Sequence, residues 1–218
     1  MISNKFKNAK LSERSLTAAV LIPIMLIITY IGGLTYLIFS FILGALAMRE
    51  LVMMVKKDKS LWKYWFYSGM FCIVFFIINL ISIRNIGLSY AIYLLIIVWT
   101  TDTAAYFCGI YFGGKKLAPN ISPSKTWSGF AGALLFSGMW GLILHLIGTV
   151  QISGNVIESI LGAIFISVCS QAGDLAESAL KRYFEVKDSG NTLPGHGGLL
   201  DRFDGMIFAS FALIGLIS

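Results

Sequence analysis

Charged residues are scarce in this chain. They make up 13% of its 218 residues, whereas a soluble domain usually carries about 25%. Hydrophobic residues account for 57%, and the mean hydropathy is +0.80. This balance argues against water as the main solvent of the fold and predicts an integral membrane protein that contacts the lipid bilayer.

Cysteine and histidine are also few. Cys72, Cys108 and Cys169 are far apart, and each lies in or beside an apolar run. This spacing predicts neither a disulfide framework nor a paired metal site, so we interpret the cysteines as small apolar packing residues. His145 and His196 are the only histidines, which argues against a zinc site built from histidine and cysteine.

The sequence lacks a basic stripe interleaved with exposed aromatic residues, although its net charge is +6. Such a stripe is the usual footprint of a nucleic-acid-binding surface. The lysines and arginines lie instead between apolar runs, as membrane topology requires. We therefore expect no nucleic-acid partner.

Apolar runs long enough to cross a bilayer recur along the chain. They predict an all-α, polytopic transmembrane helix bundle of about seven spans. The first run is interpreted as a retained helix, because further spans follow it directly. The fifth contains a cluster of glycines that would let neighbouring helices approach closely. The expected spans cover residues 16–31, 34–55, 65–83, 87–111, 129–150, 156–171 and 202–218.

The basic residues predict one orientation of this bundle. With the N-terminus in the cytoplasm, the basic loops 56–63, 113–128 and 181–204 all face the cytoplasm, and the opposite loops hold only Arg84. We expect one integrated membrane domain, with N-terminal helices in residues 1–98 and a catalytic region in residues 99–218. The short form of the chain suggests a bacterial plasma (inner) membrane.

The longest polar stretch, residues 171–204, carries the first candidate site. Asp174 and Lys181 fall on one face of a predicted helix. A glycine-rich loop follows, and Asp201 and Asp204 come where the last helix would begin. Carboxylates beside lysines and arginines are typical of a Mg²⁺–polyphosphate site. The alternative is a solvated loop whose charges only set the topology.

A second candidate site lies between the fourth and fifth spans. Asp102 is inside an apolar run, where a charge needs a partner or an ion; a purely structural ion pair is the alternative. The loop after it holds Ser122, Lys125 and Thr126. The segment 109–115 resembles the start of a phosphate-binding Walker loop, but Lys116 stands where that motif needs serine or threonine.

The segment SALKRYFEVKDSGNTLPGHGGLLDRFD, residues 178–204, resembles the complete signature of the phosphatidate cytidylyltransferase family. The similarity extends upstream to Asp102 and to the stretch 121–127. It covers about the C-terminal half of the chain, whereas the N-terminal helices match only in being apolar. The resemblance implies a polar, cytoplasm-facing active-site cavity within the bundle.

The family catalyses attack of the phosphate of phosphatidic acid on the α-phosphorus of CTP. Pyrophosphate leaves, and CDP-diacylglycerol forms for phospholipid biosynthesis. The resemblance therefore implies a nucleotidyltransferase with CTP and phosphatidic acid as substrates, Mg²⁺ as cofactor and, as a family-level expectation, a homodimer. In-line transfer of this kind needs mainly positioning and charge neutralisation, which the carboxylates and cations can supply.

The roles follow residue by residue. Asp174 and Asp201 are expected to bind the metal, with Asp204 as a third ligand, and the expected catalytic residues are Asp174, Lys181, Asp201 and Arg202. His196 is interpreted equally as a general base, a phosphate ligand or a loop cap. The expected substrate-binding residues are Asp102, Ser122, Lys125, Thr126, Arg182, Lys187, Asp188, His196, Gly197 and Gly198.

Two other functions fit parts of the pattern. A CTP-dependent transferase could act on another lipid phosphate or a polyprenol, because none of these residues identifies the acyl chains. An ion-coupled transporter could use the carboxylates Asp102 and Asp174 as ion sites within the membrane. Ion flux without pyrophosphate release would identify the transporter.

Overall fold

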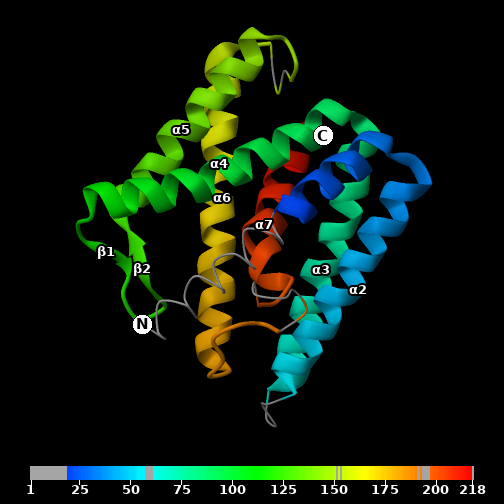
Figure 1. Cartoon of the computed structure of the whole chain (residues 1–218), viewed down its shortest axis with the longest axis vertical. Coiled ribbons are helices and arrows are strands. Elements are labelled where there is room, and N and C mark those ends of the chain that lie inside the picture. The colour runs from blue at the N-terminus through cyan, green and yellow to red at the C-terminus, as the bar shows by residue number, and fades with distance from the viewer. Residues whose placement is uncertain are drawn as a thin grey trace, which may run out of the picture.

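The computed structural model describes residues 19–56, 61–150, 152, 154–190, 192 and 197–217. It confirms the predicted all-α bundle (Figure 1). A short apolar helix, Ala19–Ile31, comes first. The helices that follow are α2 (Gly33–Val55), α3 (Trp62–Ile86), α4 (Leu88–Phe112), α5 (Trp127–Leu146), α6 (Val156–Tyr183) and α7 (Leu200–Ile217).

The helices α2 to α6 are each long and apolar enough to cross a membrane. They coincide with the second to sixth expected spans. The helix α6 continues to Tyr183, beyond the point at residue 171 where the sequence becomes polar. No glycine or proline follows Gly173 within it to break the helix, so the polar residues 174–182 extend α6 out of its apolar part.

A small hairpin was missing from the sequence prediction. The strands β1 (Lys116–Ala118) and β2 (Ser122–Thr126) pair antiparallel between α4 and α5, in a segment predicted only as a polar loop. Thr126 ends the hairpin and starts α5, because its Oγ1 accepts a hydrogen bond from the Gly129 amide at 3.1 Å. The hairpin is thus fixed to the end of a helix.

The helices α4, α5 and α6 pack through small residues, as the glycine cluster predicted. A Cβ atom at Gly129 would lie 2.5 Å from the carbonyl oxygen of Ala105, so α4 and α5 approach closely there. Fully buried hydroxyls also join the three helices. Thr101 lies 3.0 Å from Ser137 and 2.9 Å from Ser167, measured between hydroxyl oxygens.

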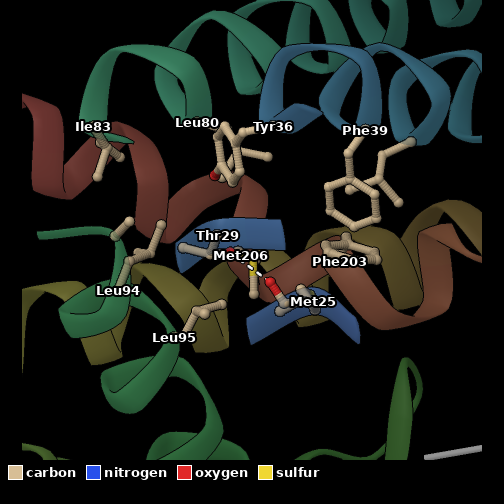
Figure 2. Close-up of a pocket in the computed structure, with 12 residues that line it drawn as sticks. Met25, Thr29, Tyr36, Phe39, Leu80, Ile83, Leu94, Leu95, Phe203 and Met206 are labelled. Atoms are coloured by element: carbon tan, nitrogen blue, oxygen red, sulfur yellow. Dashed lines mark hydrogen bonds between the residues drawn. The ribbon is translucent and has the colours of Figure 1, made fainter. Parts of the chain in front are cut away.

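The N-terminal helices pack against α7, which lies between the α2–α3 pair and α6 (Figure 1). Figure 2 shows the apolar pocket where they meet: Met25 and Thr29 of the first helix face Met206 of α7, with side chains of α2, α3 and α4 around them. Thr29 donates a hydrogen bond to the Met25 carbonyl at 2.7 Å. This packing fixes the position of α7, whose first turns carry candidate site residues.

Candidate active site

A cavity of about 810 Å³ lies between α4, the hairpin, α6 and α7. A volume of this size suits a ligand as large as a nucleotide. Acidic and basic side chains share its wall, so it can bind both cations and anionic groups. The charged residues that line it are Asp102, Lys116, Lys125, Asp174, Lys181, Asp188, Asp201, Arg202 and Asp204.

An ion pair joins the two regions that the sequence marked separately. Lys125 Nζ of β2 lies 2.5 Å from Asp174 Oδ2 of α6. Ser178, one helical turn after Asp174, donates a long hydrogen bond from its hydroxyl to Asp174 Oδ1, at 3.5 Å. The hairpin and α6 therefore present a cation and a carboxylate side by side, the two kinds of group that a metal-bound triphosphate needs.

Lys181 lies between two carboxylates. Its Nζ is 2.5 Å from Glu177 Oε2, one helical turn earlier, and 2.7 Å from Asp201 Oδ1 at the start of α7. All three side chains are largely buried, so the charges hold one another in place. The part that Glu177 has in fixing Lys181 is a finding of the structure.

Asp201 also closes the loop before α7. Its Oδ2 accepts hydrogen bonds from the amides of Ser189 at 3.0 Å and Gly198 at 2.9 Å. Gly198 lies two residues before α7, and its N–H finds an acceptor in this carboxylate. A carboxylate at a helix N-terminus is stabilised by the helix dipole as well. The same group that faces the cavity therefore holds the loop.

Glu50 of α2 is a site-supporting residue that the sequence prediction missed. Its side chain is 0% exposed, and its carboxylate accepts hydrogen bonds from the amides of Leu199 and Leu200, each at 2.8 Å, and from the Ser189 hydroxyl at 3.0 Å. The sequence signal was a carboxylate inside an apolar run. Its partners lie 139 to 150 residues further along the chain, a proximity in space that one sequence does not reveal.

The cavity brings together most of the predicted site residues and adds Lys116, which the prediction had used only to reject a Walker loop. The cavity lining does not include Ser122, Arg182, Lys187, Gly197 or Gly198. Arg182 donates a hydrogen bond to the Ile121 carbonyl at 3.2 Å, tying the end of α6 to the hairpin. His196 lies outside the described residues.

The predicted metal ligands Asp174 and Asp204 line the cavity together with Asp201. Within the described part of the chain, no three acidic, histidine or cysteine side chains are close enough to hold a metal ion by themselves. Mg²⁺ commonly takes only one or two carboxylates and completes its shell with water and substrate phosphates. The hard oxygen donors of this cavity fit that ion, and the metal assignment stays a prediction.

Comparisons with known proteins show which family the chain resembles. The model of the cytidylyltransferase family matches residues 59–217. The phosphatidate cytidylyltransferase of Bacillus subtilis is 48% identical over 145 residues, which cover 65% of this chain and 51% of that protein. The protein of the same name from Staphylococcus epidermidis is 33% identical over an alignment covering 89% of this chain and 94% of that protein. The phosphatidate cytidylyltransferase of Brucella suis is 43% identical over an alignment that covers 68% of this chain and 55% of that protein.

Proposed function

Since this chain belongs to the cytidylyltransferase family of nucleotidyltransferase enzymes, we propose that it transfers the cytidylyl group of CTP to phosphatidic acid within a membrane. An oxygen of the lipid phosphate attacks the α-phosphorus of CTP. The bond between the α-phosphorus and the bridging oxygen breaks, and pyrophosphate leaves. The products are CDP-diacylglycerol and pyrophosphate.

The observation that carries this proposal is the mixed charge of the cavity wall. Both substrates are polyanions, and Lys116, Lys125 and Arg202 line the same cavity as the aspartates. The cations lower the repulsion between the two substrates and neutralise charge on the leaving pyrophosphate. The apolar helices around the cavity would keep the acyl chains of a lipid substrate in the bilayer, with its phosphate at the level of the cavity.

The carboxylates have a complementary role. Asp174 and Asp204, with Asp201, would hold Mg²⁺, which when bound supplies positive charge to the phosphates. Asp201 stays hydrogen-bonded to the loop amides and to Lys181, so its position is set before a substrate arrives. Lys181, held by Glu177, orients Asp201.

The experiment is pyrophosphate release by the detergent-purified protein. The complete assay contains CTP, phosphatidic acid and Mg²⁺, and three further assays each leave out one of them. We expect release only in the complete assay. Release without phosphatidic acid would instead indicate nucleotide hydrolysis, and absence of release from folded protein would contradict the proposal.

A panel of acceptors separates the proposal from its nearest alternative. Phosphatidic acid is replaced by lysophosphatidic acid and by a polyprenyl phosphate in otherwise identical assays. The highest kcat/KM is expected for phosphatidic acid. A clear preference for a polyprenyl acceptor would keep the cytidylyltransferase chemistry and change the lipid.

A further inference from the structure

Glu50 lies near the end of α2, within a predominantly apolar helix, and it does not line the cavity. A buried carboxylate in such a helix is costly unless its oxygens are fully used. Here both oxygens are used: Oε1 accepts from the Leu199 amide, and Oε2 accepts from the Leu200 amide and the Ser189 hydroxyl. The partners of Glu50 are therefore the loop before α7 and the first amides of that helix.

The loop is shaped to fit this carboxylate. A Cβ atom at Gly190 would lie 2.9 Å from Glu50 Cγ, and one at Gly198 would lie 2.7 Å from Glu50 Oε2. Any other residue at either position would have to displace Glu50 or the loop. The two glycines on either side of the segment 191–197 thus let the backbone approach Glu50 closely.

Ser189 links Glu50 to the cavity. Its hydroxyl bonds to Glu50 at 3.0 Å, and its amide bonds to Asp201 at 3.0 Å. Three consecutive amides lead into α7 and are shared by the same two carboxylates. The Gly198 amide bonds to Asp201, and the amides of Leu199 and Leu200 bond to Glu50. Two carboxylates from different helices therefore hold one loop, and only Asp201 faces the cavity.

We propose that Glu50 is a positioning residue for the transfer reaction: through Ser189 and the first amides of α7 it holds Asp201 and its helix in place for metal and substrate. This inference rests on the proposed function. It assigns a role in the site to a residue of the N-terminal helices, which the motif of the C-terminal half does not include. Glu50 itself contacts neither the cavity nor the reacting groups.

The test compares the wild type with Glu50→Gln. Glutamine keeps the size of the side chain and one acceptor oxygen, but its NH₂ group faces one of the two amides, which then lacks an acceptor. The other amide bonds to a neutral oxygen in place of a charged one, and that hydrogen bond is weaker. Hydrogen exchange is measured at Leu199 and Leu200, together with the rate of pyrophosphate release as a function of Mg²⁺. We expect exchange at these two amides to accelerate roughly 10-fold, the maximal rate to fall roughly 10-fold and the half-saturating Mg²⁺ concentration to rise about threefold.

The Mg²⁺ midpoint distinguishes positioning from simple loss of folded enzyme, because a smaller active fraction lowers the maximal rate without moving the midpoint. The matched control is Glu158→Gln, which should behave as the wild type. Glu158 is exposed in the first turn of α6, whereas the cavity residues of α6 lie toward its other end. Unchanged exchange at Leu199 and Leu200, or an unchanged midpoint, would overturn the proposal.

A second variant keeps the test decisive if Glu50→Gln does not fold. Ser189→Ala removes one hydrogen bond to Glu50 and leaves the two amide contacts intact. We expect faster exchange around residues 188–190 and a smaller rise of the Mg²⁺ midpoint, and wild-type behaviour on both counts would overturn the proposal. A wild type without pyrophosphate release would instead contradict the proposed function, while the exchange data would still test whether Glu50 holds the loop.

Discussion

Asp201 carries two tasks on one carboxylate, because it faces the cavity and also accepts the amides of Ser189 and Gly198. We expect Asp201→Asn to lower the turnover number at least ~100-fold. The amide side chain has lost the charge that pairs with Lys181 and presents a donor where the loop needs an acceptor. The measurement is the initial rate of pyrophosphate release, normalised to protein that elutes as a single folded species.

Glu185→Gln is the control for this substitution, since Glu185 is exposed just after α6 and does not line the cavity. Its turnover should equal that of the wild type. Turnover near the wild-type value in Asp201→Asn would remove Asp201 from both the metal site and the catalytic site.

Lys125 is the cation that the hairpin contributes to the pair with Asp174. For Lys125→Gln we expect a higher KM for CTP and a kcat/KM lowered roughly 10- to 100-fold, because a charge-assisted contact to a phosphate is lost. Steady-state kinetics at saturating lipid measure both constants. Lys63→Gln, at the exposed start of α3, should change neither; an unchanged KM in Lys125→Gln would place the triphosphate elsewhere.

Spacing in the sequence was enough to predict Asp174 and Lys181 on one helix face and Asp201 near the start of α7, and the cavity brings these residues together. Glu50 could not be predicted in the same way. Its partners follow it by 139 to 150 residues, and one sequence gives no measure of such a distance in space. Lys116 was missed because its position in the cavity wall depends on a hairpin that was not predicted.

At the level of helices, α5 and α6 touch through backbone at Gly141. A Cβ atom there would lie 2.7 Å from both the Ala163 Cβ and the Ser159 carbonyl oxygen. We expect Gly141→Ala to lower the free energy of unfolding by about 1–3 kcal/mol, because the helices must move apart. Thermal unfolding in detergent, followed by circular dichroism, measures this loss.

Gly215→Ala is the matched control at this scale. A Cβ atom at Gly215 of α7 would meet nothing within 4 Å, and alanine is a better helix former than glycine. Its unfolding temperature should be equal to or slightly above that of the wild type. A Gly141→Ala protein as stable as Gly215→Ala would show that the α5–α6 contact tolerates separation.

The helices themselves could be predicted because each is a long apolar run, and length alone separates a bilayer span from a strand. The hairpin could not, because strands of three and five residues contain too few positions for an alternating pattern. The N-cap of α5 could not be predicted either, because the role of Thr126 is seen only from the hydrogen bond that its Oγ1 accepts from the Gly129 amide. Short elements here depend on the helices beside them.

At the scale of the whole molecule, the distribution of basic residues predicts which ends of the helices face the cytoplasm. Asn120 and Thr149 are exposed and flank opposite ends of α5. In a chain whose cysteines are replaced, a membrane-impermeant maleimide added to intact cells should label Thr149→Cys but not Asn120→Cys. Labelling after cell lysis shows that both sites react, and the reverse pattern in intact cells would invert the orientation.

The contacts of Glu50 have a consequence for biosynthesis. The ribosome makes α2 long before the amides of Leu199 and Leu200, which follow Glu50 by 149 and 150 residues. While the intervening helices enter the bilayer, the carboxylate of the nascent chain lacks these partners and is best solvated at the water interface. Only the arrival of α7 lets it become buried, so the packing of α7 against α2 completes the environment of a residue made about 150 residues earlier.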